Sequence, residues 1–370
     1  MTGGITPQKT NMKTVIVSFA PEFSTLALNE LSRHLGEIQS SPLARGIYTV
    51  HFHKPLKHLL NAWKKQPPIY IHHMFPVHKR LAIEATAKDL LRQLRRVLRK
   101  STLLRRLDKT KTFAAQVRAV DCFPSVSTEV VSGAIENLAH KITKTRVDVR
   151  TPQQVLSALI TARGTWLGLS TVEDNISPWP GGGPPIAPDR NRLNRAEYKL
   201  IEALMTFGIT LPLGGNTLDL GAGPGGWTRV LLSLGQRVTA VSPRSLVDEL
   251  LQDERVQYHK LFAEEFHSLA MSKGAKFDFI TNDMYLVPQD SARLMVQFAP
   301  LLKDGGQAIV TLKLRCKDWR KVMSHAFRIL RTSFIIPRIK HLFFNHREVT
   351  VWLRKSPKKS VSSMETKLLK

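Results

Sequence analysis

Short apolar runs alternate with helix-like segments through the second half of the chain. Apolar strands are indicated before Gly221, at residues 237–241, before Asp283 and at residues 308–314, and residues 227–234 have helical character. Strands that alternate with helices in this way favour an α/β fold, in which helices wind doubly around a mainly parallel sheet. We expect such a domain over residues 191–355.

The first half of the chain mixes strands and helices in another order. Residues 15–17 and 48–50 are apolar runs, and residues 25–35 between them have the spacing of an amphipathic helix, which predicts a small α+β unit. A strand at 112–118, a helix over about 127–143, an apolar strand at 155–161 and the segment 166–170 follow. They predict a second α+β unit.

Between these two units lies a basic helical stretch, residues 81–107. It places Leu90, Leu91, Leu94, Val97 and Leu98 on one face. Its other faces carry many arginines and almost no acidic partners, so they are either a solvated helix face or a surface that contacts phosphates; the density of arginines favours phosphates. The candidate contacts are Arg92, Arg95, Arg96, Arg99, Lys100, Arg105 and Arg106.

Proline and glycine mark a boundary near the middle of the chain. Residues 178–185 contain both at a density that neither a helix nor an interior strand tolerates. The segment 178–190 is therefore a predicted linker, which serves either as a hinge or as a fixed connection. At the other end, residues 356–370 are rich in Lys and Ser and have little to bury, which predicts a disordered basic tail.

The composition is that of a folded protein in a reducing compartment. Of the 370 residues 42% are hydrophobic, enough for real cores. Cys122 and Cys316 are far apart and form neither a metal-binding spacing nor a disulfide framework, which fits a cytoplasmic protein without a bound metal. We expect Cys316 to pack in the core, with a reactive thiol as the alternative. The first twelve residues lack the apolar core of a secretory signal.

The charge indicates an anionic partner. Lys and Arg number 55 against 29 Asp and Glu, a formal net charge of +26. Such an excess favours a polyanion. A membrane surface would require a terminal amphipathic helix or a lipid motif, and no clear one is present; no apolar run approaches the roughly 20 residues of a membrane helix. Nucleic acid is the favoured partner.

The segment 218–228 contains the most specific chemistry in the chain. An apolar strand ends at Asp219 and Leu220, a glycine-rich turn follows, and a helix begins near Trp227. Glycines in such a turn let the backbone approach a ligand closely, as in nucleotide pockets at the carboxyl ends of parallel strands. No Lys-Ser/Thr pair follows, so it is not a phosphate-binding loop of the NTPase kind. A tight turn without a ligand is the alternative.

This segment resembles the S-adenosylmethionine loop of the FtsJ-like 2′-O-ribose methyltransferases, and four further residues extend the resemblance. Those enzymes carry a Lys-Asp-Lys-Glu tetrad in a fixed chain order. This sequence offers Lys199 after Asn194-Arg195-Ala196, Asp283 after an apolar strand, Lys313 within the strand 308–314, and Glu348 before Val349. Each alone would be an ordinary surface residue. The four in the right order are specific.

The resemblance implies a Rossmann-like domain that binds S-adenosylmethionine and methylates an RNA 2′-hydroxyl. Lys313 would lie at the hydroxyl, where it either takes the proton as a base or stays charged and stabilises the alkoxide. Lys199, Asp283 and Glu348 would set its charge and orientation. A 2′-hydroxyl as substrate makes the nucleic acid RNA.

The same resemblance implies a set of cofactor contacts. Family members usually hold the cofactor ribose with a carboxylate at the end of the second strand, but here that position is Ser242, a weaker partner than a charged acceptor. Glu264 matches the acidic residue that meets the adenine amino group; a surface glutamate at a helix start is the alternative. The full candidate set is Asp219, Gly221, Ala222, Gly223, Pro224, Gly225, Gly226, Trp227, Ser242, Glu264 and Asp283.

The first half is similar to the THUMP domain, an RNA-binding module found beside several RNA-modifying enzymes. Segments 113–118, 147–152 and 167–170 carry this similarity. The implied organisation is a ferredoxin-like domain over 12–75, a THUMP-like RNA-binding domain over 76–177, the linker 178–190, the FtsJ-like domain over 191–355 and the tail 356–370. Across the chain the resemblance is to bacterial enzymes that methylate cytidine of large-subunit ribosomal RNA; tRNA is the alternative substrate.

Two other functions remain open. A base-methylating enzyme would show Asn/Asp-Pro-Pro-Tyr/Phe after the fourth strand, whereas this chain has Asn282-Asp283-Met284-Tyr285 without either proline. A non-catalytic RNA-binding or assembly protein could retain the fold. The departure at Ser242 favours this second alternative, and the complete tetrad opposes it.

Overall fold

The structure, a computed structural model, describes residues 12–82, 84, 86–121, 126–187, 189, 191–314 and 319–357. The chain divides into two compact units, Met1–Pro185 and Ile186–Lys370. Cys122 and Cys316 lie outside the described residues, as does the predicted tail beyond Pro357.

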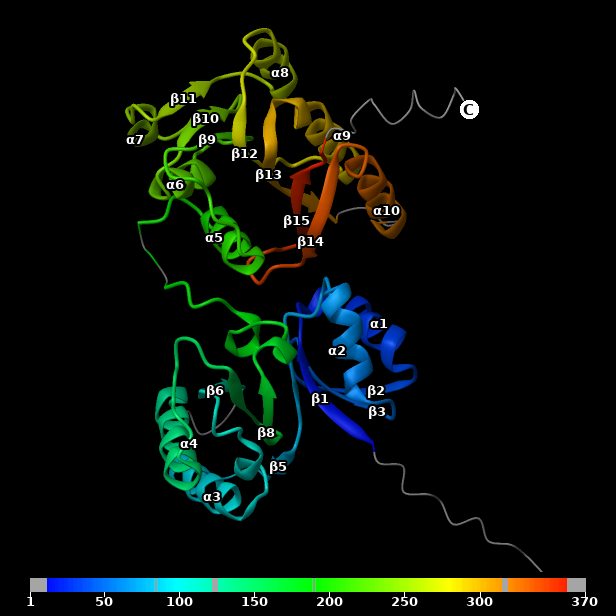
Figure 1. Cartoon of the computed structure of the whole chain (residues 1–370), viewed down its shortest axis with the longest axis vertical. Helices are drawn as coiled ribbons and strands as arrows, with labels where there is room; N and C mark the ends of the chain where they lie inside the picture. Colours follow the sequence, from blue (N-terminus) through cyan, green and yellow to red (C-terminus); the bar gives the residue numbers. More distant parts are fainter. Residues whose placement is uncertain are drawn as a thin grey trace, which may run out of the picture. The chain divides into compact units, whose positions relative to one another are not determined.

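The first unit begins with a four-stranded antiparallel sheet, in the order β2-β3-β1-β4. Its elements follow one another as β1 (Lys13–Ser18), α1 (Ser24–Leu35), β2 (Ile38–Ala44), β3 (Ile47–Phe52), α2 (Leu56–Lys65) and β4 (His73–Pro76) (Figure 1). Buried side chains recur every fourth residue, at Ala27, Leu31 and Leu35 on α1 and at Leu59 and Trp63 on α2. This β-α-β-β-α-β arrangement is ferredoxin-like.

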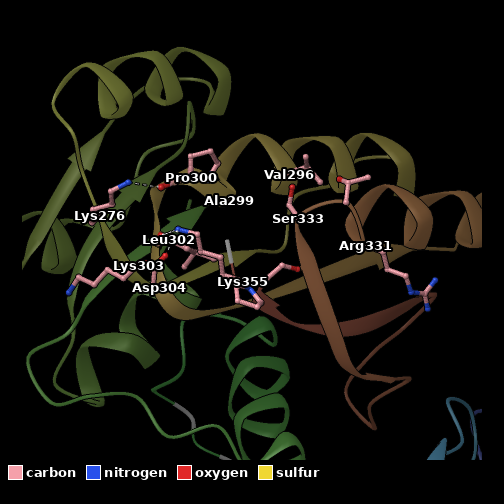
Figure 2. A pocket seen from close by; sticks show the side chains of 13 residues that line it. Lys276, Val296, Ala299, Pro300, Leu302, Lys303, Asp304, Arg331, Ser333 and Lys355 are labelled. Carbon is pink, nitrogen blue, oxygen red and sulfur yellow. Dashed lines mark hydrogen bonds and ion pairs between the residues drawn. The ribbon is translucent and has the colours of Figure 1, made fainter. Parts of the chain in front are cut away.

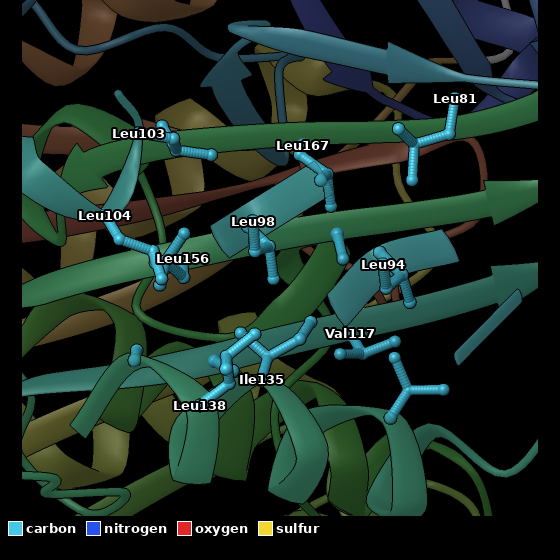
Figure 3. Packing of buried hydrophobic residues seen from close by; sticks show 14 of the residues in the cluster. Leu81, Leu94, Leu98, Leu103, Leu104, Val117, Ile135, Leu138, Leu156 and Leu167 are labelled. Atoms are coloured by element: carbon cyan, nitrogen blue, oxygen red, sulfur yellow. The ribbon is translucent and has the colours of Figure 1, made fainter. Parts of the chain in front are cut away.

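A second four-stranded sheet follows in the same unit, with the order β5-β8-β7-β6. Its strands are β5 (Lys79–Leu81), β6 (Phe113–Val120), β7 (Gln154–Thr161) and β8 (Gly164–Thr171), and only the pair β6–β7 is parallel. The helices α3 (Ala87–Lys100) and α4 (Thr128–Thr143) contribute Leu94, Leu98 and Ile135 to the core over this sheet, where they meet Leu156 and Leu167 (Figure 3).

The prediction of one helix over residues 81–107 was wrong at both ends. Leu81 lies in β5, and α3 begins only after Thr86, whose hydroxyl accepts the Asp89 N–H at 3.1 Å as an N-cap. The helix ends at Ser101, which has extended backbone. The chain then turns through the 3-10 helix η2 (Leu104–Arg106), so that Leu103 and Leu104 reach the core, which a continued helix would not allow.

The first part of the proline- and glycine-rich segment is packed against the first unit. The Ser18 hydroxyl donates to the Gly181 carbonyl at 2.8 Å, and the Gln116 amide donates to the Pro178 carbonyl at 2.5 Å. The 3-10 helix η3 (Glu173–Asn175) precedes this segment, and η4 (Pro180–Gly182) lies within it. A Cβ on Gly182 would lie 2.7 Å from the His72 carbonyl oxygen. Residues 178–182 are therefore held as part of the first unit.

The second unit is built on a seven-stranded sheet in the order β11-β10-β9-β12-β13-β15-β14. The parallel strands are β9 (Asn216–Leu220), β10 (Arg237–Val241), β11 (Val256–His259), β12 (Phe277–Asn282) and β13 (Leu302–Lys313). The last two, β14 (Phe334–Lys340) and β15 (Glu348–Lys355), form an antiparallel pair, and β15 runs antiparallel to β13. The predicted doubly wound sheet is confirmed, with this antiparallel extension.

Helices connect the strands of this sheet. They are α5 (Ala196–Phe207), α6 (Gly226–Ser233), α7 (Asp248–Leu251), α8 (Ala263–Ser272), α9 (Pro288–Phe298) and α10 (Trp319–Leu330), with the 3-10 helix η5 (Ala299–Leu301) before β13. Leu200 of α5 and Leu231 of α6 share a core with Phe279 and Ile309 of the sheet. The strand order reverses between β9 and β12, which is where open α/β sheets bind ligands at the carboxyl edge.

The first unit contains a small cavity, whose polar lining residues include His73, Gln116, Arg118 and Ser157. His73 Nε2, Gln116 Oε1 and Ser157 Oγ are buried there without a hydrogen-bond partner in the described part of the chain. Burial, and then the charge of Arg118, lower the pKa of His73 to about 3. The neutral imidazole is therefore the form that the fold accommodates.

We expect the first unit to lose stability as the pH falls below 6.5. His73 takes up a proton in the unfolded chain there but not in the folded unit, so the loss reaches about 2 kcal/mol at pH 5 and increases toward pH 3. Hydrogen exchange of β1 and β4 between pH 5 and 7.5 measures this. The variant His73→Phe should lose this part of the pH dependence, whereas the exposed-site control His53→Phe should keep it; equal pH dependence in all three proteins would contradict the assignment.

Candidate active site

Four charged side chains of the second unit form a closed ring of alternating sign. Lys199 Nζ lies 2.7 Å from Asp283 Oδ2 and 3.0 Å from Glu348 Oε1. Lys313 Nζ lies 2.7 Å from Asp283 Oδ1 and 2.5 Å from Glu348 Oε2. The side chains are between 7% and 17% exposed, so the ring is largely desolvated but still reached by solvent. All four members of the predicted tetrad are thus brought together.

The sheet topology explains why residues as distant in the sequence as Lys199 and Glu348 meet here. Asp283 directly follows β12 and Lys313 ends the neighbouring parallel strand β13, so both lie at the carboxyl edge. Because β15 is antiparallel to β13, it begins at that edge, and Glu348 is the direct partner of Lys313 in the register. Lys199 reaches the same point from the start of α5.

The ring sets the charge of its members. Burial alone raises the pKa of Asp283 and Glu348, but the charges of Lys313 and Lys199 outweigh it and hold both carboxyl pKa values below their usual range. For Lys199, burial acts to lower the pKa, and the two carboxylates outweigh it and raise the pKa. Asp283, Glu348 and Lys199 are therefore ionised at neutral pH.

Two neutral side chains hold the carboxylates and were missed from the sequence. The Thr311 hydroxyl donates to Asp283 Oδ1 at 2.6 Å, and the Asn345 amide donates to Glu348 Oε1 at 3.3 Å. Thr311 lies two residues before Lys313, on the same face of β13, so the strand period could have identified it. Nothing in the sequence around Asn345 indicates its role.

The glycine-rich turn joins β9 to α6 beside the ring. Gly221 and Gly225 have positive φ, 76° and 121°. A Cβ on Gly221 would lie 2.3 Å from Met284 Cγ, and one on Gly223 would lie 2.3 Å from the Arg244 carbonyl oxygen. The turn therefore fits closely between the segments that follow β10 and β12. The first N–H groups of α6 have no acceptor within the helix, and that of Thr228 bonds to the Asp219 carboxylate.

Two residues expected to contact the cofactor support the turn from within. Asp219 is buried, and its carboxylate accepts the hydroxyls of Thr228 at 2.7 Å and Thr281 at 2.9 Å. Burial raises the pKa of Asp219 to about 6. Trp227 is also buried and donates its indole N–H to the Ala196 carbonyl at 2.7 Å. Asp219 thereby links β9 to α6 and β12, and Trp227 links α6 to α5.

The remaining candidates differ in what they present. The Ser242 hydroxyl accepts the Arg244 N–H at 3.0 Å and shapes the turn after β10. Glu264 is exposed at the start of α8, whereas its neighbour Glu265 accepts the Phe262 N–H at 2.8 Å. Asn282, which the sequence did not single out, ends β12 opposite Leu220, and its amide nitrogen is buried without a partner among the described residues.

These residues fit S-adenosylmethionine in part. The turn supplies a close backbone approach, Asn282 supplies an unused donor beside it, and Glu264 supplies an exposed acceptor. The end of β10 supplies no carboxylate.

The seven basic candidates of the first unit are all exposed. Arg92, Arg95, Arg96, Arg99 and Lys100 line a surface hollow of about 630 Å³ along α3, with Leu91 among them. Arg105 and Arg106 follow on η2. Arg92 pairs with Asp89 at 2.9 Å. The helix thus buries one leucine stripe and presents a cationic face, as the spacing predicted.

Another hollow, of about 850 Å³, lies at the opposite edge of the seven-stranded sheet (Figure 2). Its lysines are engaged: Lys276 donates to the Pro300 carbonyl at 2.7 Å, Lys303 pairs with Asp278 at 2.8 Å, and Lys355 pairs with Asp304 at 3.3 Å. Lys303 and Lys313 lie near opposite ends of β13. This hollow is therefore remote from the ring.

Comparisons with known proteins agree with the geometry. Residues 192–303 match the family model of the FtsJ-like methyltransferases. Residues 192–303 form an FtsJ-like methyltransferase domain. This FtsJ-like domain includes Lys199 and Asp283, while Lys313 and Glu348 follow the matched segment. Methyltransferases of this family use S-adenosylmethionine.

The chain is also similar to named relatives. It is 31% identical over 223 residues to the ribosomal RNA large subunit methyltransferase M of Halorhodospira halophila, covering 59% of this chain and 62% of that protein. It is 32% identical over 204 residues to the same-named protein of Azoarcus sp., covering 52% of this chain and 54% of the relative. The chain thus matches less than two thirds of the length of these relatives.

Among solved structures, TrmN from Thermus thermophilus aligns with 94% of this chain and 100% of its own at 15% identity and a TM-score of 0.39. In the described part of the chain, no group of three or more His, Cys, Asp and Glu side chains could hold a metal ion. No described helix has the length and apolarity needed to cross a membrane.

We expect Asp283→Asn to destabilise the protein by about 3 kcal/mol, because it leaves two buried lysines with one carboxylate. Urea unfolding at pH 7 measures the loss. The matched control is Asp278→Asn, which removes the half-exposed pair with Lys303 and should cost less than about 1 kcal/mol. Since the pKa of Asp283 is lowered, its contribution is present above pH 4 and is lost below it. Equal losses in the two variants would contradict the buried ring.

Proposed function

We propose that the protein transfers the methyl group of S-adenosylmethionine to a ribose 2′-hydroxyl of RNA. The observation that carries this proposal is the ring of Lys199, Asp283, Lys313 and Glu348, which lies beside the glycine-rich turn of an FtsJ-like methyltransferase domain. When bound, the cofactor would supply an activated methyl group. The turn, Asn282 and Glu264 are the residues that would hold it.

The ring is suited to a weakly acidic hydroxyl. Lys313 would contact the 2′-oxygen, where it either accepts the proton or remains charged and stabilises the developing alkoxide. Lys199 would add positive charge at the same oxygen. Asp283 and Glu348 fix both ammonium groups in place, each carboxylate bonding one oxygen to each lysine. Alignment of the oxygen with the methyl group supplies much of the remaining acceleration.

We further propose large-subunit ribosomal RNA as the substrate, with tRNA as the alternative. The names of the relatives support the first, and the net charge of +26 supports RNA in general. The first unit, with its ferredoxin-like and THUMP-like parts, would bind the RNA through the cationic face of α3. We place this activity in the cytoplasm.

We expect Lys313→Ala to lower the rate of methyl transfer at least about 100-fold. Labelled S-adenosylmethionine and total cellular RNA are incubated with the protein, and the RNA is separated by size and digested to nucleosides. Label on a 2′-O-methyl nucleoside in the large-subunit fraction is the expected result.

The matched control is Lys303→Ala, on the same strand and also paired with an aspartate, which should keep wild-type activity. Label on a base would contradict the ring assignment. Absence of both cofactor binding and methyl transfer in the wild-type protein would overturn the proposal in favour of a non-catalytic RNA-binding protein.

Three arginines of α3 are replaced by alanine: Arg95, Arg96 and Arg99. This variant should bind RNA more weakly and with a smaller dependence on salt, while its affinity for the cofactor stays the same. Each lost phosphate contact lowers the slope of log K against log salt by about 0.7 to 0.9. Filter binding from 50 to 300 mM salt measures it. A control variant removes the same amount of charge from exposed positions of the same unit by replacing Lys141, Arg146 and Arg150 with alanine. Identical slopes for the two variants would exclude a specific role for α3.

A further inference from the structure

An aromatic cluster lies beside the ring, on the connection between β14 and β15. The Phe344 ring stacks on Tyr198, with centroids 4.9 Å apart and planes at 21°. Phe343 meets Phe344 edge to face at 5.6 Å. The Arg192 guanidinium covers the Tyr198 ring at 4.5 Å. Tyr198 is the chain neighbour of Lys199, and Phe344 precedes Glu348 by four residues, so the cluster adjoins two members of the ring.

Phe343 stands at the solvent-facing end of this cluster. Its side chain is 47% exposed, whereas Phe344 and Tyr198 are half-buried. A single exposed apolar residue is common on protein surfaces and needs no function. The way in which the backbone of Phe343 is held distinguishes this one.

A buried carboxylate fixes the two phenylalanines. Glu202 Oε1 accepts the Phe343 N–H at 2.7 Å, and Glu202 Oε2 accepts the Phe344 N–H at 2.8 Å. Glu202 is only 2% exposed. Burying a carboxylate to anchor a surface connection is costly, and burial raises the pKa of Glu202 to about 7 against the opposing effect of these N–H groups.

The same connection is held at two more points. Asn345 Oδ1 accepts the Leu342 N–H at 2.8 Å and the Thr350 hydroxyl at 3.1 Å. A ring nitrogen of His341 lies 2.8 Å from the His346 carbonyl oxygen. Lys199 and Glu202 are three residues apart on α5, so one helix positions both a lysine of the charged ring and the exposed side chain of Phe343.

A rigid aromatic face beside a ribose-methylating site is suited to a nucleobase. Proteins that recognise unpaired RNA stack its bases on aromatic and arginine side chains. Arg195, His346 and Arg347 are exposed nearby in the chain and can meet the flanking phosphates. We propose that Phe343, backed by Phe344 and Tyr198, is the stacking platform for an unpaired base of the substrate RNA. This inference rests on the proposed function, and it makes Phe343 a positioning residue that selects unpaired RNA.

The test compares Phe343→Leu and Phe343→Trp with wild-type protein. Two assays are used: methyl transfer to total cellular RNA, and quenching of a single-stranded 12-nucleotide RNA that carries 2-aminopurine in its centre. Leucine keeps the apolar volume but removes the π-face, so kcat/KM for RNA should fall about 10- to 100-fold, mainly through KM, and quenching should be lost. Tryptophan should restore both within about threefold. Ile335→Ala, at another exposed position of the same unit, is the control.

The outcomes separate this inference from the proposed function. Methyl transfer and quenching that are both unchanged in Phe343→Leu would overturn the platform and leave the methyltransferase intact. If the wild-type protein transfers no methyl group but quenching still depends on an aromatic side chain at position 343, the platform would be supported and the proposed enzymatic function would be contradicted. Loss of S-adenosylmethionine binding in Phe343→Leu would make the residue structural and would also overturn the inference.

Discussion

The mutual neutralisation of two lysines and two carboxylates in a largely desolvated site is the interaction on which the second unit depends. None of the four charges would be tolerated there alone, because an unpaired buried ion costs several kcal/mol. Each carboxylate bonds both lysines, so the loss of one side chain disturbs two pairs at once. In the proposed reaction, the arrangement that stabilises the edge of the sheet would also place two ammonium groups beside the developing oxyanion.

Sheet topology makes this ring possible. A purely parallel sheet would bring the carboxyl ends of β12 and β13 together, but it would place the start of their neighbour at the opposite edge. The antiparallel β15 begins where β13 ends, so Glu348 pairs in register with Lys313. The connection before β15 then carries Phe343, Phe344 and Asn345 to the same edge, and Glu202 of α5 holds it there. One helix and one connection therefore support the ring and the proposed base contact together.

The proposed function would use the charge of the first unit and the geometry of the second. In the first, α3 buries a leucine stripe and presents arginines, which suits contacts with phosphates that carry no sequence information. In the second, the polar groups are held by short, directed hydrogen bonds, which suits the orientation of a single nucleotide. Ser242 does not contribute to either unit's proposed task. Its hydroxyl accepts the Arg244 N–H in the turn after β10, and the position offers the cofactor ribose a hydroxyl in place of a carboxylate.

The sequence alone determined most of the element types it addressed and the glycine-rich turn, because strand period and glycine placement are local properties, and its resemblance to a known family singled out the four residues of the ring. It also determined which face of α3 is apolar. Tertiary structure decided what local patterns do not contain: that the helix stops at Ser101 so that Leu103 and Leu104 reach the core, that Asp219 and Trp227 face inward, and that Asn345 and Glu202 support the site. These depend on which segments meet across the sheet, and contacts between distant parts of a chain leave no period in it.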